Sequence, residues 1–578
     1  MCGIIGYVGS RKASEVITDG LKRLEYRGYD SVGLAIRNLD GVDIRKDKGH
    51  IEDVSALLQF TTIEGNIGIG HTRWATHGSV CRENSHPHTD CSGKIVLVHN
   101  GVVENYLKLR KSLSEKGHIF ISQTDSEVIV HLIEEHSKNG PLPQAFRKAI
   151  AEIDGSYAIA MISAKDHEER IYLARKNSPL ILGIGKGEML CASDIPAMLR
   201  YTKTFVALED GDSAEISRNG YKVLDHLGHE SARKQITVDW DPAMAQKGGY
   251  PHFMLKEIND QAHFINESLA SDVGAVGDLI GSYGRIDIVA CGTSYHAGLL
   301  FSILLQRKGK CAQAFIASDY PYVARPDRKT LVFAISQSGE TADVLQALRF
   351  AKDSEKVALT NTVGSSICGL CDHVILMNSG PEIGVAATKT FTSELGVISK
   401  LIYGKDRLAP LSSLIGKTLL EENAIKTIAS KLSGSEHAFF IARGVSVPIA
   451  YEGSLKFKEI TYIHSEAYPG GELKHGTLSL ISQGTPVIAL APDDESITKL
   501  IGNIKESKAR GAFVISLSAN PDVISESDMS IRLPDDLDPA LAPFALIVIL
   551  QLLAYHVSVL RGINPDRPRN LAKSVTVE

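Results

Sequence analysis

The sequence predicts an α/β protein in which a mixed N-terminal domain precedes two doubly wound parallel-sheet units. Short apolar runs alternate with amphipathic helical stretches along the 578 residues. From residue 286 onward the order becomes strand, turn and helix, which implies a parallel sheet covered by helices on both faces. This order restarts near residue 425, so the C-terminal part reads as two copies of one unit.

The composition is that of a globular protein without a strong charge bias. Hydrophobic residues make up 43% and charged residues 22% of the chain, which argues against disorder. At roughly 150 residues per domain, the length suggests about three or four domains. The 62 basic and 68 acidic side chains give a net charge of −6, which argues against nucleic acid or an anionic membrane as a main partner.

The cysteines and the apolar segments predict a cytoplasmic protein. Eight scattered cysteines are typical of a reducing compartment rather than a disulfide scaffold. Residues 1–9 lack a basic segment before an apolar one, so no signal peptide is expected. The apolar stretch 544–560 is short for a membrane span and contains Gln551 and His556, so we expect a buried helix.

In the N-terminal part, strands and helices are mixed up to residue 238. A helix is expected at 126–136, where apolar residues share one face. Residues 239–252 contain two prolines and a Gly pair and are interpreted as a linker. Strands are expected at residues 4–8, 95–98, 157–162 and 180–184.

The C-terminal part divides into two units and a tail. We assign 253–424 to the first unit, 425–563 to the second and 564–578 to a tail that lacks periodicity and is expected to be loose. In the first unit, strands are expected at 286–290, 331–335 and 357–360, and helices at 294–306 and 341–351. In the second unit, strands are expected at 438–442, 486–491 and 513–517, and helices at 449–460 and 497–509.

Cys2 is a candidate nucleophile. Removal of Met1 before a small residue would leave Cys2 at the N-terminus, with a thiol and an α-amine in one residue. That amine, with an ordinary pKa near 7.7–8.0, is a general base within reach of the thiol. The alternative is a small buried hydrophobe on the first strand, and Cys2 alone favours that alternative.

Polar clusters elsewhere in this domain favour the interpretation of Cys2 as a nucleophile. Residues 71–78 (HTRWATHG) are dense in polar groups, although Arg73 and Trp74 could also be a surface ion pair and a core aromatic. Asn100-Gly101 follows a predicted strand, and an amide with a Gly N–H can form an oxyanion hole. Asp125 stands before a helix, where it could instead be an N-cap.

Taken together, these motifs resemble class II glutamine amidotransferases, which are N-terminal-nucleophile (Ntn) hydrolases with a four-layer αββα fold. The resemblance implies that Cys2 attacks the side-chain amide of L-glutamine. It rests on MCGIIGYVG, RLEYRGYDSVG (23–33), HTRWATHG (71–78), HPH (86–88), HNG (99–101) and TDSE (124–127).

The resemblance also assigns roles to the other motif residues. Asn100 and Gly101 would stabilise the oxyanion. Arg73 would bind the α-carboxylate of glutamine, because a guanidinium can donate two hydrogen bonds to a carboxylate. Asp125 would bind the α-amine of glutamine. Three further roles are implied: Thr76 and His77 would line the pocket, Arg27 would help to close it, and Trp74 would gate the path of ammonia.

Residues 336–341 (SQSGET) lie between a predicted strand and helix and form a candidate phosphate site. They offer hydroxyls, an amide and backbone N–H groups at a helix start, without the Lys of a nucleotide-binding P-loop. Residues 291–294 (CGTS) occupy a similar turn. Either loop alone could be a helix cap, but two such loops after consecutive strands of the first unit favour a phosphorylated ligand. In the second copy the equivalent turn, 491–495, is acidic and should repel phosphate.

Lys456, Glu459 and His475 are further candidates. Lys456 and Glu459 are three residues apart and share a helical face, where a surface ion pair is the commoner outcome. His475 belongs to a Gly-rich loop, 470–476, and is unremarkable alone.

These segments resemble sugar isomerase (SIS) domains, and the whole architecture is then an αββα Ntn-hydrolase domain followed by two doubly wound SIS domains. The combined resemblance implies that L-glutamine supplies nitrogen to D-fructose 6-phosphate, that no cofactor is needed, and that a homodimer forms through the SIS domains. Ammonia would pass through a dry interior passage. The resemblance rests on CGTS, SQSGETAD (336–343), EIGVAATKTFT (382–392), EGSLKFKEI (452–460), GELKHG (471–476) and PRNLAKSVTVE (568–578).

The resemblance implies catalytic roles for four of these residues. Lys573 would form a Schiff base with the open-chain ketose, and Glu459 would move a proton between C1 and C2. Lys456 would assist that transfer. His475 would assist ring opening, and in the family pattern it can come from the partner subunit.

Binding roles follow in the same way. Ala387 replaces a Ser that is common in the family, so one hydroxyl contact to the sugar is in question, and Thr477 replaces a common Pro. The expected phosphate and sugar contacts are Ser336, Gln337, Ser338 and Thr341, with Thr293, Ser294 and the backbone of Val385.

No metal site is expected from these patterns. Cys368 and Cys371 have CxxC spacing without a second pair, and His86 and His88 lack a third spaced ligand. Two other functions stay open: amination of another sugar phosphate or its reversal as a deglycase, and a module that only senses a sugar phosphate. A sensor would need neither Lys573 nor Glu459.

Overall fold

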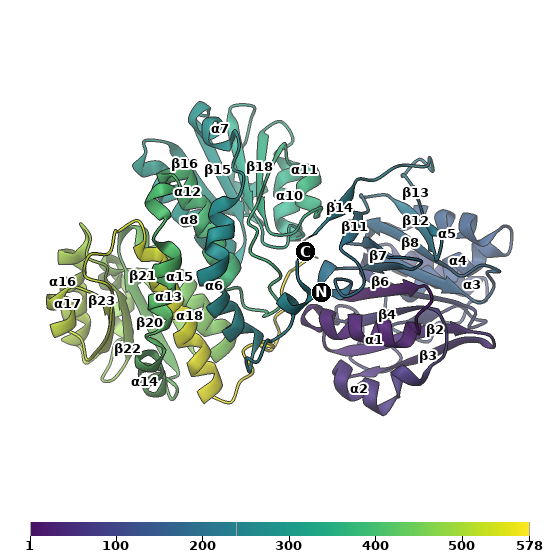
Figure 1. Ribbon diagram of the computed structural model, residues 1–578, viewed down its shortest axis with the longest axis horizontal. Coiled ribbons are helices and arrows are strands. Elements are labelled where there is room, and N and C mark those ends of the chain that lie inside the picture. Colours follow the sequence, from purple (N-terminus) through teal and green to yellow (C-terminus); the bar gives the residue numbers. More distant parts are fainter. Residues whose placement is uncertain (1, 239, 577–578) are drawn as a thin grey trace.

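The computed structural model describes residues 2–238 and 240–576 and shows two lobes (Figure 1). The N-terminal domain forms one lobe, and the two parallel-sheet units form the other. Met1 and the last two residues, 577–578, lie outside the described residues, as does Asp239, the first residue of the predicted linker.

The N-terminal domain contains two antiparallel sheets. The eight-stranded sheet has the order β14 (Gln235–Thr237), β11 (Thr204–Ala207), β9 (Ile181–Ile184), β10 (Met189–Ala192), β1 (Gly3–Val8), β4 (Ile67–Arg73), β2 (Ser31–Asn38), β3 (Gly41–Lys48). The six-stranded sheet has the order β13 (Gly220–Leu224), β12 (Ser213–Ser217), β8 (Arg170–Lys176), β7 (Gly155–Ser163), β6 (Ile95–Val103), β5 (His88–Thr89).

Alternation along β1 explains why the two sheets stack. Ile4 and Val8 face the six-stranded sheet and join one apolar cluster, whereas Ile5 and Tyr7 face the opposite way, toward α1 (Ala13–Leu24). Helix α2 (Ile51–Leu57) covers the same outer face as α1, and three helices cover the other outer face: α3 (Tyr106–Glu115), α4 (Glu127–Ser137) and α5 (Leu142–Ala151). The four-layer αββα prediction is therefore confirmed.

The two C-terminal units repeat one strand order. The first sheet is parallel, with the order β16 (Cys311–Ile316), β15 (Arg285–Ala290), β17 (Thr330–Ile335), β18 (Glu355–Thr360), β19 (His373–Leu376). The second is also parallel, with the order β21 (His464–Pro469), β20 (His437–Ala442), β22 (Pro486–Leu490), β23 (Phe513–Ser518), β24 (Met529–Arg532). The predicted duplication is confirmed.

Helices cover both faces of each of these sheets. One apolar cluster runs continuously through the inner faces of both units, and each unit has a separate cluster on its outer face. The first unit has α6 (Phe253–Ala270), α7 (Val276–Ser282), α8 (Gly292–Arg307), α9 (Tyr320–Val323), α10 (Ala342–Phe350), α11 (Ser366–Leu370), α12 (Lys389–Tyr403) and α13 (Leu411–Leu419). The second has α14 (Glu422–Leu432), α15 (Val447–Thr461), α16 (Ile497–Lys508), α17 (Pro521–Ser525) and α18 (Ala542–Leu560).

Helix α18 is the buried helix that the sequence predicts. It is the one helix in the described part of the chain that is long and apolar enough to cross a membrane. Its most apolar 18-residue window is 89% buried inside the protein, where it packs against α14 and α15. The apolar composition of α18 is therefore accounted for by the shared core of the two units.

The structure can be compared with two predicted domain limits, the boundary between the two units and the linker before α6. The boundary drawn between residues 424 and 425 falls within α14. Residues 240–252 form a 3₁₀ turn, Pro242–Ala245, and otherwise neither helix nor strand before α6 begins.

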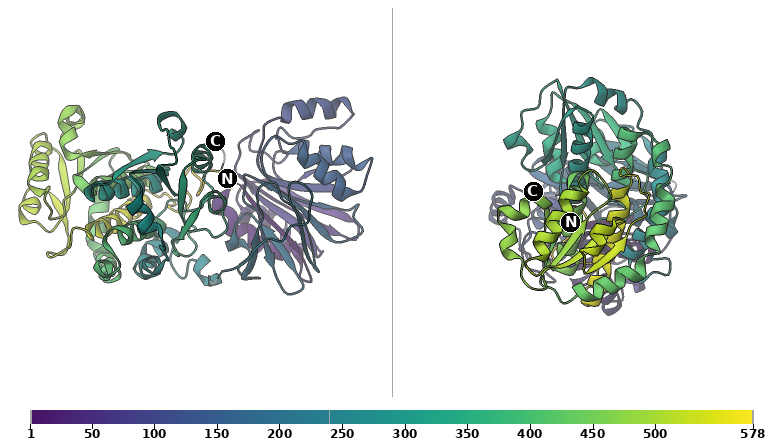
Figure 2. Two further views of the ribbon diagram at one scale, coloured as in Figure 1. Left: turned by 90° about the horizontal axis from the view of Figure 1, so that it is seen from above. Right: turned by 90° about the vertical axis from the view of Figure 1, so that its left-hand side faces the viewer.

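The C-terminal tail is not loose, so that expectation is wrong. Residues 564–576 form no helix or strand, but side chains and backbone groups hold them. The Asp566 carboxylate accepts hydrogen bonds from the backbone N–H groups of Phe253 and Met254, both at 2.8 Å, and Arg567 pairs with Glu25 at 2.5 Å. The yellow tail accordingly leaves α18 and runs to the junction with the N-terminal domain (Figures 1 and 2).

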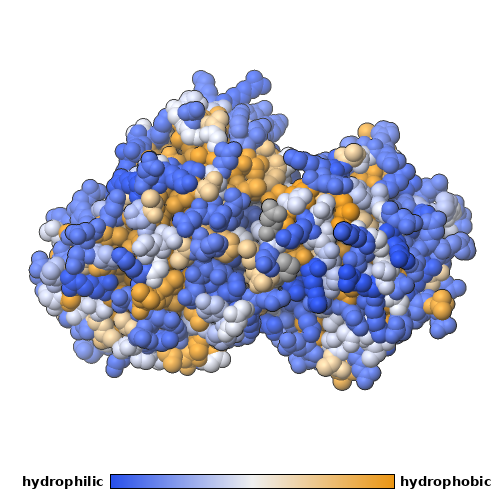
Figure 3. Space-filling view, in the orientation of Figure 1, coloured by the Kyte–Doolittle hydropathy of each residue, from blue (hydrophilic) through white to orange (hydrophobic). Residues whose placement is uncertain are grey.

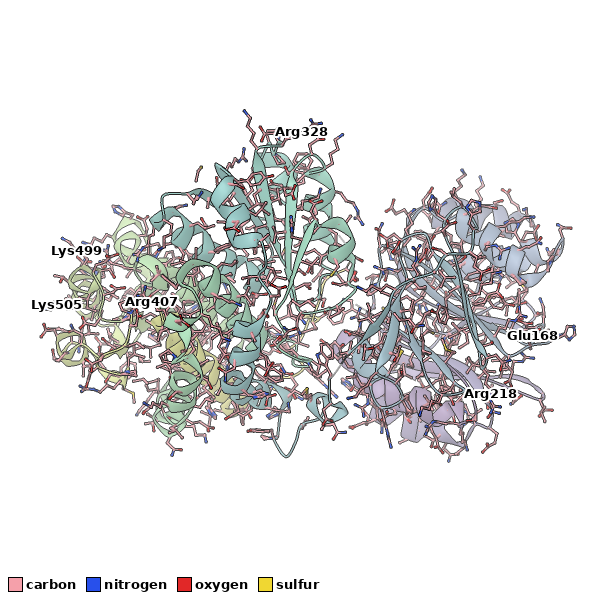
Figure 4. The ribbon with its side chains drawn as sticks, turned by 45° about the horizontal axis from the view of Figure 1, so that its top comes forward. Glu168, Arg218, Arg328, Arg407, Lys499 and Lys505 are labelled. Carbon is pink, nitrogen blue, oxygen red and sulfur yellow. The ribbon has the colours of Figure 1, made fainter. Side chains whose placement is uncertain are left out.

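Charged side chains lie on the outside of both lobes. Hydrophilic residues cover most of the face seen in Figure 3, with smaller hydrophobic areas between them. Figure 4 labels charged side chains of both lobes, in the N-terminal domain (Glu168 and Arg218) and in the two parallel-sheet units (Arg328, Arg407, Lys499 and Lys505).

Candidate active site

Cys2 lies immediately before β1, and strand pairing places it beside the end of β4. Gly3 pairs with Thr72, so the Cys2 thiol reaches the backbone of Trp74: Sγ accepts a hydrogen bond from N–H at 3.2 Å and donates one to the carbonyl oxygen at 3.5 Å. Burial raises the pKa of this thiol. Its use as a nucleophile therefore requires a base close by, which the α-amine of a processed Cys2 would supply.

Asn100 faces Cys2 from the neighbouring sheet. Its Nδ2 donates to the Cys2 carbonyl oxygen at 3.1 Å and to Ser193 Oγ at 2.9 Å, while its Oδ1 accepts from His71 Nε2 at 3.0 Å. Burial lowers the pKa of His71 to about 3, so the ring is neutral and its Nε2–H fixes which way the amide points. His71 and Ser193 are positioning residues that the sequence analysis did not assign.

Asn100 and Gly101 lie within a strand and not after one, which corrects the sequence-based expectation. Strand β6 continues to Val103 because it pairs with β7 along its full length. Gly101 has φ +128°, and an added Cβ would lie 2.0 Å from the Ser156 carbonyl oxygen. Only glycine fits this position, and its backbone lies beside the Asn100 amide.

Arg73 and Asp125 supply opposite charges near the thiol. Arg73 is buried and donates to the carbonyl oxygens of Ser79 at 3.3 Å, of Gly78 at 3.4 Å, and of His77. Burial lowers the pKa of Arg73, and the nearby carboxylate of Asp125 acts in the opposite sense. Asp125 is not an N-cap: its Oδ2 accepts from the Val103 N–H at 2.7 Å.

A cavity of about 240 Å³, the thiol cavity, contains the Cys2 side chain. Arg27, Trp74 and Thr76 line this cavity, whereas Arg73, His77 and Asp125 are not among its lining residues. The remaining walls come from Asn100, Gly101, Ser178 and, in the C-terminal tail, from Asn570, Leu571, Ala572, Ser574, Val575 and Thr576. The tail therefore closes the thiol cavity.

A second cavity of about 40 Å³, the amine cavity, contains Lys573. Gln337 and Ser338 of the predicted phosphate loop line it, together with Glu382. Arg27 and Ser574 belong to the walls of both cavities. The N-terminal thiol and the C-terminal amine thus lie on two sides of one shared wall.

The phosphate loop lies where the strand order of the first unit reverses. The order β16-β15-β17 places residues 291–294 and 336–341 at adjacent strand ends, which is where ligands bind in such sheets. Ser336 Oγ lies 2.9 Å from Thr341 Oγ1 and accepts from the Gly339 N–H at 3.1 Å. Gly339 has φ +65°, and an added Cβ would lie 2.1 Å from Ser365 Oγ. The conformation of the loop is therefore fixed by its own hydrogen bonds and by the fit of Gly339.

The tail reaches this loop. The Val575 carbonyl oxygen accepts a hydrogen bond from the Ala342 N–H at 3.0 Å, at the first turn of α10. Lys573, two residues earlier, forms a buried ion pair with Glu382. Burial would raise the pKa of Glu382, but the charge of Lys573 and hydrogen bonds from Thr388 and Thr390 hold it at about 2. Glu382 is therefore ionised.

Lys456 is completely buried, so its predicted helical pair is not a surface ion pair. Its Nζ lies 2.5 Å from Glu459, 3.3 Å from Glu452 and 3.2 Å from Thr293 Oγ1. Burial would lower the pKa of Lys456, but the two carboxylates raise it above its ordinary value. Lys456 and Thr293 link α15 of the second unit to α8 of the first.

Three other predicted residues have distinct positions. Ser294 Oγ donates to Glu394 at 2.7 Å, and Val385 is buried in the segment before α12. His475 ends an exposed 3₁₀ turn, Gly470–His475, which packs against α16 and β21 of the second unit. His475 is not one of the residues that line the amine cavity.

His86 and His88 have the structural hydrogen bonds that the sequence analysis prefers over metal binding. His86 Nδ1 accepts from the His99 N–H at 3.3 Å, and His88 Nε2 lies 3.1 Å from Thr124 Oγ1. Burial keeps the pKa of each ring well below its ordinary value. Both rings are therefore neutral parts of the core beneath β4.

Comparisons with known proteins agree with this architecture. The model of the SIS domain family matches residues 279–403 and 431–561, and that of the glutamine amidotransferase domain matches residues 71–200. The C-terminal domain of a glucosamine-fructose-6-phosphate aminotransferase from Francisella tularensis aligns with a TM-score of 0.53 and 34% identity, covering 56% of this chain and 99% of that domain.

Curated relatives extend the likeness to the entire chain. The glutamine–fructose-6-phosphate aminotransferase (isomerizing) of Pyrococcus horikoshii is 48% identical over 600 aligned residues, and that of Thermococcus kodakarensis is 46% identical over 604. In both comparisons 100% of each chain is covered. With the fold, the two matched domain types and this full-length identity, the chain belongs to the family of isomerizing glutamine–fructose-6-phosphate aminotransferases.

Proposed function

We propose that this chain transfers the amide nitrogen of L-glutamine, as ammonia, to D-fructose 6-phosphate and isomerises the product to D-glucosamine 6-phosphate, with L-glutamate as the second product. The observation that carries this proposal is the wall shared by the thiol cavity and the amine cavity, to which Arg27 and Ser574 both belong. The two half-reactions then take place next to each other, in cavities that the C-terminal tail closes.

In the first half-reaction, Cys2 attacks the glutamine amide. The thiol proton passes to the α-amine of Cys2 and on to the leaving nitrogen, so that ammonia and a thioester form. The Asn100 amide and the Gly101 N–H stabilise the oxyanion. Arg73 attracts the glutamine carboxylate and Asp125 its ammonium, with Thr76, His77 and Trp74 shaping the pocket. Water then hydrolyses the thioester to glutamate.

In the second half-reaction, Lys573 gives a proton to Glu382, its ion-pair partner, and the free amine adds to C2 of the open-chain ketose and expels water to form a Schiff base. Ammonia replaces the lysine on C2 and forms a 2-imine. Glu459 moves a proton from C1 to C2, which yields the 2-amino aldose without net oxidation or reduction. Lys456, held beside Glu459, supplies positive charge at this site. Ser336, Gln337, Ser338 and Thr341 bind the phosphate, with Thr293, Ser294 and the Val385 backbone near the sugar.

We further propose a cytoplasmic homodimer that is joined through the SIS domains and binds neither nucleic acid nor membrane. The exposed position of His475 supports the dimer, because a ring that assists sugar opening must then reach the amine cavity of a partner chain. All eight cysteines are free, which supports a reducing compartment. The nearly balanced charge supports small-molecule partners.

A substrate panel tests the proposed function. The purified full-length chain is given glutamine with fructose 6-phosphate or with other ketose and aldose phosphates, and the amino sugars are identified by mass spectrometry and chromatography against standards. We expect glucosamine 6-phosphate from fructose 6-phosphate, and none from a Cys2→Ala variant unless ammonium is supplied. Amination of a different sugar phosphate, and not of fructose 6-phosphate, would contradict the proposal. Failure of borohydride to trap the sugar on Lys573 would also contradict it.

A further inference from the structure

Four potential metal ligands converge at the edge of the N-terminal domain, away from both cavities. Cys91, His118, His131 and Glu134 each offer one donor atom, and these atoms all lie within 4.8 Å of one another. Cys91 lies between β5 and β6, and His118 between α3 and α4. His131 and Glu134 stand three residues apart on α4, so the four side chains come from three separate segments.

The distances between donors match those of tetrahedral zinc. Cys91 Sγ lies 3.8 Å from His118 Nδ1 and 3.6 Å from His131 Nδ1, and Glu134 Oε2 lies 2.9 Å and 3.1 Å from the same two nitrogens. Bonds of about 2.0 Å to nitrogen and oxygen and about 2.3 Å to sulfur, at tetrahedral angles, separate the donors by roughly 3.3–3.6 Å. An ion at the centre of the cluster needs only small shifts of these side chains.

A carboxylate lies behind each imidazole. His118 Nε2 lies 3.0 Å from Glu135, and His131 Nε2 lies 3.7 Å from Glu127. Glu135 is within hydrogen-bonding distance of His118 Nε2 and can hold its proton, which leaves Nδ1 as the metal ligand, the usual outer arrangement around zinc-bound histidines. Glu127 is farther from His131 Nε2 and is a charge partner of that ring. Both rings are buried, so their orientation is set by the fold.

The alternative is a cluster of ordinary ion pairs, and it places two positively charged rings side by side. His118 faces a carboxylate with each of its nitrogens, and so does His131. Both rings would have to be imidazolium cations to present an N–H group to each of these three oxygens, because both Nδ1 atoms face the same Glu134 Oε2, yet their centroids lie 5.3 Å apart in a buried setting. A single divalent ion replaces both protons at the centre and also gives the Cys91 thiolate a partner.

We propose that Cys91, His118, His131 and Glu134 bind one structural Zn²⁺ ion. A thiolate with two imidazoles and one carboxylate selects zinc over magnesium or calcium, and four protein ligands leave no open position for catalysis. The sequence analysis expected no metal site, because these ligands spread over 44 residues and match none of the short zinc-ligand spacings.

The ion would brace the segment that carries Asp125. Glu127, which faces His131, also accepts hydrogen bonds from the backbone N–H groups of Ile121 at 2.7 Å and Ser122 at 2.8 Å. The zinc ligands therefore flank residues 119–126 on both sides. Loss of the ion should loosen this segment and weaken glutamine binding, while synthesis from ammonium at the other site persists.

Metal content tests the proposal directly. The full-length chain is produced with zinc, freed of loosely held ions by gel filtration and analysed by inductively coupled plasma mass spectrometry. We expect about one zinc per wild-type chain, and strong loss of zinc in Cys91→Ser, whose exposed position tolerates the change. Cys311→Ser, a second exposed free cysteine, and Cys2→Ala are matched controls that should keep the ion.

A second readout does not depend on enzyme activity. Cobalt in place of zinc should give the charge-transfer absorption of a thiolate–Co²⁺ bond in wild type and in Cys311→Ser, but not in Cys91→Ser. Chelation should lower the Tm of the wild type by several degrees and leave that of Cys91→Ser unchanged. A wild-type chain that takes up no zinc, or a Cys91→Ser variant that keeps as much zinc as wild type, would overturn the proposal. Neither result would bear on the proposed aminotransferase reaction.

Discussion

Arg27 and Ser574 stand in the one wall that the thiol cavity and the amine cavity share. Arg27 also donates to the Cys2 carbonyl oxygen at 3.2 Å and to Asp194 at 3.1 Å, so its position is fixed from the N-terminal domain. Ser574 follows Lys573 in the tail. Ser574 thus lies next to the proposed sugar-binding amine and also lines the cavity of the proposed nucleophile Cys2, so events at one site can reach the other through this wall.

Ser574→Leu should uncouple the two half-reactions. Ser574 is buried, and a larger apolar side chain would fill the space between the cavities. We expect glutamine hydrolysis to continue while glutamine-dependent synthesis of glucosamine 6-phosphate falls about tenfold or more, because ammonia escapes to water and becomes protonated. The ratio of product to glutamate measures the coupling. Ser574→Ala, which removes the hydroxyl without adding bulk, should keep that ratio, and equal ratios in all three chains would argue against the shared wall as the route.

Gly101→Ala should silence the glutaminase half-reaction alone. An added Cβ would approach the Ser156 carbonyl oxygen to 2.0 Å, so the strand must shift and move the oxyanion donors away from Cys2. Loss of one such donor lowers kcat by about 10²–10³-fold. Glutamate release measures this loss, and synthesis with ammonium measures the intact second site. Gly93→Ala, at a glycine with open space around it, is the control; unchanged glutamate release by Gly101→Ala would remove Gly101 from the oxyanion hole.

Glu382→Gln should release the tail. Lys573 would keep its charge in a buried position without a counter-ion, which costs about 3–5 kcal/mol when a buried pair is broken. We expect a lower Tm and faster tryptic cleavage after Arg569, an exposed residue of the tail, whereas Pro568 prevents cleavage after Arg567. Glu436→Gln, at an exposed glutamate, should behave like wild type. A tail that resists trypsin equally in Glu382→Gln would show that this ion pair does not hold it.

The stability of the chain should fall between pH 4.5 and about 8 in a way that depends on Glu394. Burial, together with the charges of Glu452 and Glu382, raises the pKa of Glu394 from 4.5 to about 8. Within this window the folded chain keeps a proton that the unfolded chain has released. The free energy of unfolding therefore contains a contribution that is complete below pH 4.5 and is lost as the pH rises to about 8.

Glu394→Gln tests this assignment. A neutral amide can still accept the hydrogen bond from Ser294, so we expect the variant to lose part of the pH dependence and to have a higher Tm than wild type at pH 8. Denaturant unfolding at several pH values measures the difference. Glu421→Gln, at an exposed glutamate, should follow the wild-type profile. A Glu394→Gln profile parallel to wild type would contradict the raised pKa.

The sequence was sufficient for the elements whose signal is local. Strands β1, β15 and β20 and helix α15 were predicted within a few residues, because apolar periodicity and turn residues mark their limits. The end of β6 was not predicted. Asn100 and Gly101 are expected after the strand, but these residues pair with β7 and belong to it. Pairing between distant strands overrode the local preference.

Residues whose environment is built from distant segments could not be predicted. From the sequence, Lys456 is expected in a surface ion pair. In the structure it is buried between the two units, where it contacts Glu452 and Thr293. The tail reads as loose, yet contacts with Glu25, Phe253 and Ala342 hold it. The four candidate zinc ligands are brought together only by the fold of the N-terminal domain.

Isotope dilution tests the central claim most directly, that nitrogen moves from Cys2 to the sugar as ammonia that never reaches solvent. The full-length chain is given amide-¹⁵N glutamine and fructose 6-phosphate in the presence of a large excess of unlabelled ammonium. The account predicts that glucosamine 6-phosphate formed with glutamate keeps nearly all of the ¹⁵N label. Product that carries the isotope ratio of the bulk ammonium would contradict it.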